Sequence, residues 1–190
     1  MRASLVVFFL AAAPAVADEP KVADQELGAR VGASLNFAGI APGGFYVAGS
    51  WLYRVTDNFW FDGRAAFTLG GSGAKCTFPS TGQPRCDSAL TSGSGGELLA
   101  GVRWFVPQPG VVTPWIGGGV GTMLASFSDD NLTGLGIPFW VTGGARARVS
   151  DTVSVGAEAV VEFGPVRYGN GIGWQGFADL KLIFGVDFAL

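Results

Sequence analysis

The last part of the chain, Trp174 to Leu190, alternates between two kinds of residue. One set of alternate positions carries no charge and holds Gly176, Ala178, Leu180, Leu182, Phe184, Val186 and Phe188; the other holds Gln175, Phe177, Asp179, Lys181, Ile183, Gly185 and Asp187. A period of two is typical of a β-strand, whose side chains point to opposite faces in turn. This segment exceeds the roughly 5–6 residues of an ordinary strand. It reaches the about 9–11 residues that a tilted strand needs to cross a bilayer.

The same period recurs along the chain and predicts eight strands. We expect them at Leu27–Phe37, Gly44–Arg54, Phe59–Leu69, Gly96–Val106, Val111–Ala125, Ile137–Val149, Val153–Gly164 and Trp174–Leu190. Tight turns follow the second, fourth and sixth strands. Longer polar connections, Gly70–Gly95, Ser126–Gly136 and Pro165–Gly173, follow the third, fifth and seventh. Because barrels of the outer membrane have short turns at one end and longer loops at the other, the pattern predicts an all-β fold, an eight-stranded antiparallel up-and-down transmembrane β-barrel.

Charges inside the predicted strands lie on the face opposite the aliphatic residues. The set is Arg30, Arg54, Asp62, Arg64, Glu97, Arg103, Arg146, Arg148, Glu158, Glu162, Asp179, Lys181 and Asp187. A soluble, lipocalin-like barrel would turn these charges outward, whereas a membrane barrel would turn them inward.

Two features favour the membrane barrel. The charged face is rich in Gly, which weakens a solvent-facing strand but fits a crowded lumen; it holds Gly28, Gly32, Gly101, Gly117, Gly119, Gly121, Gly144, Gly156 and Gly185. The apolar face carries aromatic residues toward the strand ends, as in the aromatic girdles of membrane proteins. One band would comprise Tyr53, Phe59, Trp104 and Phe188, and the other Phe37, Phe45, Phe67, Phe139, Phe163 and Trp174.

The first residues have the form of a signal peptide covering 1–17. Arg2 supplies the positive start, Leu5 to Ala13 the apolar core, and Ala15-Val16-Ala17 the cleavage site. We expect the mature chain to begin near Asp18, with a polar lead over 18–26 and the barrel over 27–190. Export places the two cysteines in an oxidising compartment, so Cys76 and Cys86 are expected to form a disulfide.

The eight-strand pattern, the stretch Pro114 to Gly121 and the closing amphipathic strand resemble the small outer-membrane barrels of the OmpA/OmpX type. The resemblance covers nearly all of 27–190. It implies a Gram-negative outer membrane, contact with outer-membrane lipid, and insertion by the barrel-assembly machinery. Two departures are visible. Phe188 is followed by Ala189 and Leu190 where members usually end on an aromatic residue, and we expect no peptidoglycan-binding domain after the barrel.

Several classes of function are disfavoured by what the chain lacks. It has no His and a net charge of −3, so a His-based catalytic base, a zinc site and a nucleic-acid footprint are not expected. We expect neither a metal nor a cofactor. The acidic pair Asp129-Asp130 is read as a solvated loop rather than a catalytic pair.

The remaining hypotheses concern the lumen and the loops. The inward charges are nearly balanced, seven cations against six acids, and predict a hydrogen-bonded plug, because an eight-stranded barrel is just wide enough for side chains to fill it. A narrow ion path is the alternative. The cysteine loop would protect an exposed connection, or present Lys75, Phe78 and Arg85 to an unknown external ligand. We therefore expect a non-enzymatic scaffold that displays loops, for adhesion or envelope integrity; a channel and a lipid-modifying barrel without His are the competing functions.

Overall fold

The computed structural model describes residues 24–71, 73–77, 85–89, 93–128 and 131–190. The predicted signal peptide 1–17, most of the predicted lead 18–26, Phe78 and the pair Asp129-Asp130 lie outside the described residues. Within them, no helix is long and apolar enough to cross a membrane, a finding that does not bear on strands.

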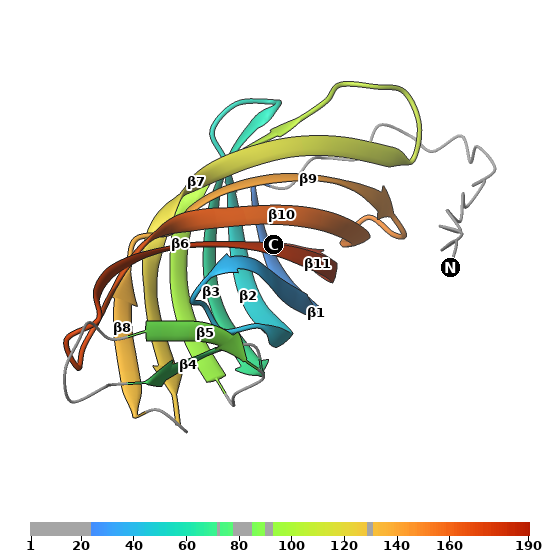
Figure 1. The fold of residues 1–190 in the computed structure, drawn as a ribbon. Helices are drawn as coiled ribbons and strands as arrows, with labels where there is room; N and C mark the ends of the chain where they lie inside the picture. The colour runs from blue at the N-terminus through green and yellow to red at the C-terminus, as the bar shows by residue number, and fades with distance from the viewer. Residues whose placement is uncertain (1–23, 72, 78–84, 90–92, 129–130) are drawn as a thin grey trace, which may run out of the picture.

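The described chain forms antiparallel strands that close into a ring. They are β1 (Gln25–Gly39), β2 (Gly44–Arg54), β3 (Phe59–Gly70), β4 (Gly73–Thr77), β5 (Arg85–Ala89), β6 (Gly93–Phe105), β7 (Val112–Phe127), β8 (Leu132–Gly136), β9 (Phe139–Arg148), β10 (Val153–Tyr168) and β11 (Gly173–Ala189). Nine of them make one sheet in the order β11-β1-β2-β3-β6-β7-β8-β10-β9, with further pairings between β11 and β10 and between β7 and β9. Because β11 also pairs with β1, as in Leu27 opposite Phe188, the sheet has no long free edge (Figure 1). The predicted eight-stranded barrel is confirmed, with β8 and β9 as two parts of one wall position.

Three of the predicted loops are wrong in part; one of them, Pro165–Gly173, contains the end of β10 and the first residue of β11. The segment Gly70–Gly95 contains the β4–β5 hairpin, which forms a sheet of its own. The segment Ser126–Gly136 contains the end of β7 and the whole of β8. The strand predicted over Ile137–Val149 is shorter in the structure, where β9 covers Phe139–Arg148. Pro138 separates β8 from β9, since a proline has no N–H to donate to the ladder; the Pro138 carbonyl still accepts a bond of 2.9 Å from Gly121 N.

The two ends of the barrel differ. One, here the turn end, has the short connections 55–58, 106–111 and 149–152, together with the start of β1 and the end of β11. The other, here the loop end, has the connections 40–43, 71–92, 128–131 and 169–172. In Figure 1 the β4–β5 hairpin stands at the loop end. The core of the molecule lies inside the ring, along the axis between these two ends.

Candidate functional site

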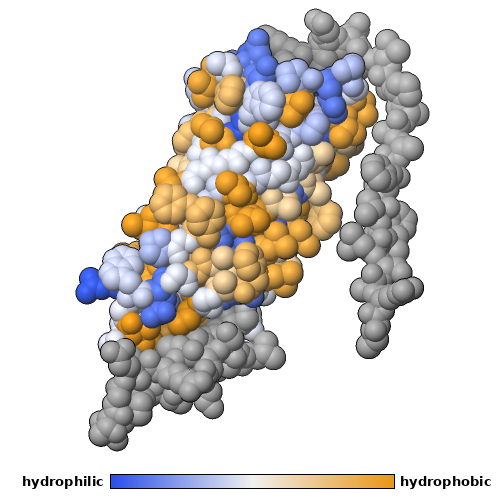
Figure 2. Space-filling view, turned by 45° about the horizontal axis from the view of Figure 1, so that its top comes forward, coloured by the Kyte–Doolittle hydropathy of each residue, from blue (hydrophilic) through white to orange (hydrophobic). Residues whose placement is uncertain are grey.

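The outer face of the wall is hydrophobic, as the sequence predicts. On β11, Leu182 and Phe184 expose 48% and 66% of their surface, whereas the neighbouring Lys181 and Ile183 are buried. Altogether thirty-one large hydrophobic residues of the described chain expose at least 37% of their surface. Figure 2 shows hydrophobic residues spread over the wall, with hydrophilic ones gathered toward its ends. The lumen, by contrast, receives the charged side chains.

The half of the lumen nearer the turn end holds a network that we call the arginine layer: Arg30, Asp62, Arg64, Arg103, Glu158 and Asp187. Arg64 donates from Nη1 and Nη2 to the two carboxylate oxygens of Glu158, both at 3.0 Å. Asp62 Oδ2 accepts from Arg64 Nη2 and from Arg103 Nη2, both at 2.8 Å. Arg30 pairs with Asp187 and reaches Glu158. All six side chains are buried, so each charge depends on these partners, because an unpaired buried ion is very costly.

The half nearer the loop end holds a second group, the lysine layer: Glu97, Glu162, Asp179 and Lys181. Lys181 Nζ donates to both carboxylate oxygens of Glu97 at 2.7 Å and to Glu162 Oε2 at 2.6 Å. It also lies 5.1 Å from the centre of the Tyr46 ring. Asp179 is buried in the same layer. Lys181 thus pairs with two carboxylates, and Asp179, directly opposite Glu162 in the β10–β11 ladder, is a third buried acid. By contrast, Arg30, Arg64, Arg103 and Arg146 face an equal number of buried acids.

Aromatic rings pack against the arginine layer on the side of the turn end. Trp60, Phe105 and Trp115 pack with Leu52 as a buried cluster. The guanidinium carbon of Arg103 lies 4.7 Å from the centre of the Trp115 ring. Such a cation–π contact stabilises a charge without adding a second one.

Trp140 provides a similar contact deeper in the lumen, where the guanidinium carbon of Arg64 lies 4.9 Å from the centre of its ring. Arg146, above the ring of Phe105 at 4.1 Å, pairs with Glu26. The guanidinium groups of Arg64, Arg103 and Arg146 are therefore each held by a carboxylate and by an aromatic ring.

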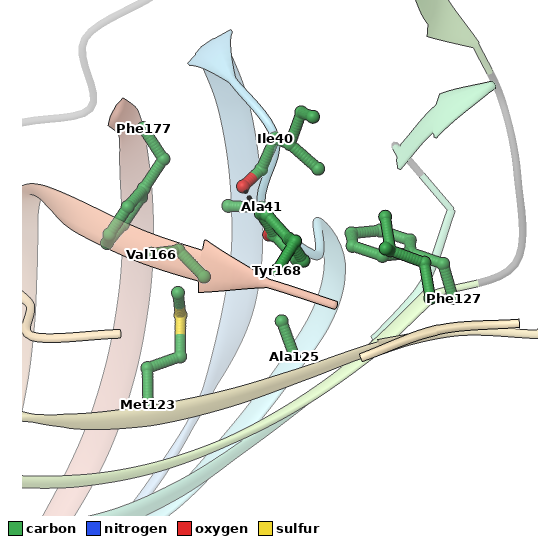
Figure 3. Close-up of a cluster of buried hydrophobic side chains, with 9 residues drawn as sticks. Ile40, Ala41, Met123, Ala125, Phe127, Val166, Tyr168 and Phe177 are labelled. Carbon is green, nitrogen blue, oxygen red and sulfur yellow. Dashed lines mark hydrogen bonds between the residues drawn. The ribbon is translucent and has the colours of Figure 1, made fainter. Parts of the chain in front are cut away.

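A hydrophobic cap fills the lumen at the loop end. This loop-end cap consists of Ile40, Ala41, Met123, Ala125, Phe127, Leu132, Val166, Tyr168 and Phe177. Figure 3 shows side chains of β7, β10 and β11 converging on the short connection that carries Ile40 and Ala41. The Tyr168 hydroxyl donates to the Ile40 carbonyl at 2.6 Å, and Asn36 Nδ2 donates to the carbonyl of Ala41 at 3.1 Å. These bonds hold the connection across the mouth.

Taken along the axis, the lumen is a stack of filled layers. A cavity of about 10 Å³ lies beside Arg30, Trp115, Glu158 and Asp187, which is about the space of one water molecule. Within the part of the chain that the structure describes, no three Asp, Glu or Cys side chains converge as a metal site. The arrangement has the chemistry of a structural ion-pair core, in which every buried cation of the described residues is paired with at least one carboxylate and hydrophobic clusters lie toward both ends.

No family model matches the chain, and no curated protein matches it. Among solved structures, the Neisserial surface protein A matches with a TM-score of 0.64 at 16% identity, over 88% of this chain and 97% of that chain. The outer membrane protein OprG from Pseudomonas aeruginosa matches with 0.50 at 9% identity, over 89% and 96% of the two chains. AlkL, an outer membrane protein solved in lipid bilayers, gives 0.50 at 10%, over 96% and 97%. The chain has the fold of the small outer-membrane β-barrels.

In this outer-membrane-type barrel, eleven of the thirteen strand charges singled out by the sequence are buried inside the ring. They are Arg30, Asp62, Arg64, Glu97, Arg103, Arg146, Glu158, Glu162, Asp179, Lys181 and Asp187. The other two differ from the expectation. Arg54 is half-buried at the turn end, with Asp24 at 2.8 Å, and Arg148 is exposed. Both residues occupy alternate positions that face inward along the strand. Each, however, is the last residue of its strand, where the lumen opens at the rim of the barrel.

Sequence reasoning missed two charged residues of the barrel strands because one predicted strand began too late and another ended too early. Glu26, assigned to the lead, belongs to β1 and is buried with Arg146; its even-numbered parity with Gly28 and Arg30 was the available signal. Arg167, assigned to a loop, belongs to β10 and is exposed. The inward side chains of Trp60, Trp115 and Trp140 were not placed in the site either, although they share the parity of the charges.

Proposed function

We propose that this protein is a structural scaffold of a bacterial outer membrane, whose barrel is closed and whose loop end displays connections to the outside. The observation that carries the proposal is the division of side chains by the wall: large hydrophobic residues outside and paired charges inside. Monomeric soluble proteins rarely expose a contiguous apolar patch above a few hundred Å². An encircling apolar wall therefore needs lipid around it.

By analogy with other such barrels, the turn end faces the periplasm and the loop end faces outward. Export with cleavage near Asp18 and insertion by the barrel-assembly machinery belong to the same proposal. A non-catalytic role does too, and is supported by the absence of His from the sequence. If lipid analysis of cells with and without the protein revealed a modified lipid, the lipid-modifying alternative would replace the scaffold.

Ion conductance tests the closed lumen. We expect purified protein in a planar bilayer to produce no discrete current steps, because the arginine layer, the lysine layer and the loop-end cap fill the axis. Insertion is checked by heat-modifiable migration on a detergent gel, and a wide porin added to the same membrane shows that steps can be detected. Discrete steps whose size changes in Arg64→Lys would instead establish a channel through the arginine layer.

We also propose the disulfide between Cys76 and Cys86. The two residues are directly opposite in the β4–β5 ladder, and directly opposite residues have Cα atoms about 4.5–5.5 Å apart, within the range that a disulfide requires. Protein extracted from the outer membrane without reductant is expected to react with no maleimide until it is reduced, and with two maleimides per chain afterwards. Labelling before reduction would contradict the bond.

A further inference from the structure

One charged residue of the barrel wall, Arg167, points outward instead of into the lumen. Arg167 is exposed between the buried residues Val166 and Tyr168 on β10, so its side chain leaves the outer face. Every other charged residue in the described barrel strands has the inward parity or lies at a strand end on that parity. An outward arginine in a membrane barrel is costly at the middle of the bilayer and nearly neutral close to the headgroups.

The position of Arg167 fits the headgroup level. On the same face of β10, Phe163 stacks with Phe139 of β9 at 6.1 Å between ring centres. Arg167 is four residues further toward the loop end, or about 13 Å along a strand that rises about 3.3 Å per residue. Trp174, a member of the same aromatic band, is directly opposite Arg167, so the guanidinium group lies at the outer margin of this band, close to the level of the lipid phosphates.

Apolar side chains flank the guanidinium group on the outer wall. Arg167 is directly opposite Trp174 of β11 and Leu135 of β8, which expose 61% and 58% of their surface. A ligand of Arg167 must therefore be anionic where it meets the arginine and apolar where it meets its neighbours. This combination describes a lipid better than a soluble anion.

A hollow of about 380 Å³ lies at the same place, lined by Arg167, Tyr168, Gly169, Asn170, Gly171 and Gly173. Its backbone is held in shape, since Asn170 Nδ2 donates to the carbonyl of Asn131 at 2.9 Å and Gly169 N donates to that of Thr133 at 3.0 Å. Asn170, Gly171 and Gly173 have positive φ angles of 54°, 80° and 75°. Glycine at such positions lets a ligand approach the backbone closely.

We propose that Arg167 and this hollow bind the phosphate-bearing headgroup of an anionic outer-leaflet lipid, with Trp174 and Leu135 against the start of its acyl chains. An arginine guanidinium matches a phosphate with two parallel N–H donors, and tryptophan is enriched at the membrane interface. The inference rests on the proposed location in the outer membrane. It adds a site for a lipid of one kind to a wall whose other outward residues are mainly hydrophobic.

Native mass spectrometry of the folded full chain in a neutral detergent tests the site. The probe is lipid A, a phosphorylated glycolipid, compared with the same glycolipid after its phosphates are removed. We expect the protein to retain one lipid A in preference to the dephosphorylated form, and Arg167→Gln to lower that retention roughly tenfold, the effect of losing one charge-assisted hydrogen-bond pair. The matched control is Arg148→Gln, which removes an exposed arginine at the turn end and should leave retention unchanged.

Two results would overturn the site: equal retention by Arg167→Gln and the unchanged protein, or an equal fall in Arg148→Gln, which would mean unspecific attraction by charge. Failure of the scaffold proposal looks different, since a mature protein that stays soluble without detergent would reveal it before any lipid is added. Heat-modifiable migration of each variant shows that the barrel has folded, so a loss of lipid is not a loss of structure.

Discussion

Replacing Lys181 by Met is expected to destabilise the folded barrel by about 3–5 kcal/mol, the usual cost of breaking a buried ion pair from one side. The ammonium group is the partner of Glu97 and Glu162 at 2.6–2.7 Å, and Asp179 is buried in the same layer. Methionine fills much of the same volume, so the expected loss is electrostatic. Without Lys181, three buried carboxylates would have no cation in their layer.

Equilibrium unfolding in urea, followed by tryptophan fluorescence in a fixed detergent or lipid, measures this loss. Arg148→Gln serves as the control for removal of a positive charge at an exposed position and should change the free energy of unfolding by no more than about 0.5 kcal/mol. Adding Glu97→Gln to Lys181→Met should recover part of the loss, because contacting residues couple by about 0.5–3 kcal/mol. If the double variant were destabilised by the sum of the two single changes, the lysine layer would not act as one unit.

The architecture could be predicted because its chemical signal repeats in every strand. Outward residues contact one environment and inward residues another, so a period of two with a strong contrast recurs from β1 to β11. The contrast between outward hydrophobic and inward polar residues weakens toward the loop end of the wall. There Leu132 and Gly134 on β8 still alternate inward with the exposed Leu135, but the sequence around them is polar and resembles a loop. The strand ends and the β4–β5 hairpin were missed for this reason.

The pairing of the inward charges could not be predicted, because parity fixes the face of a residue but neither its height nor its direction across the ring. Arg64 meets Glu158, 94 positions away in the chain, and Lys181 meets Glu97, 84 positions away. These contacts depend on the stagger of all strands around the barrel. The same limit explains Arg148, which has the correct parity and lies at the rim.

The interior also contains rings that need space, and two glycines provide it. Gly101 of β6 and Gly119 of β7 are directly opposite in the ladder, and Gly119 is opposite Trp140 of β9. A Cβ atom on Gly101 would lie 2.6 Å from Trp140 Cζ2 and 2.3 Å from the carbonyl oxygen of Gly118. The ring of Trp140 therefore occupies space that a side chain at Gly101 would fill, and the guanidinium group of Arg64 lies against this ring.

Gly119→Val is expected to cost at least about 3 kcal/mol, at the upper end of overpacking effects. A Cβ at this position would lie 2.1 Å from the carbonyl oxygen of Ala100 and 2.6 Å from the Cα of Gly101; both are backbone atoms, which cannot turn aside as a side chain can. The matched control is Gly49→Val on β2, where a Cβ would meet nothing within 4 Å.

Valine favours strands, so Gly49→Val should leave the free energy of unfolding unchanged or raise it by about 0.5–1 kcal/mol. The same urea titration measures both variants, and the shift from the folded to the heat-denatured band on a detergent gel shows whether Gly119→Val folds at all. Equal stability of the two variants would mean that the backbones of β6 and β7 can move apart to accept a side chain at Gly119. A loss confined to Gly119→Val would show that the close approach of β6 and β7 inside the barrel requires a residue without a side chain at this position.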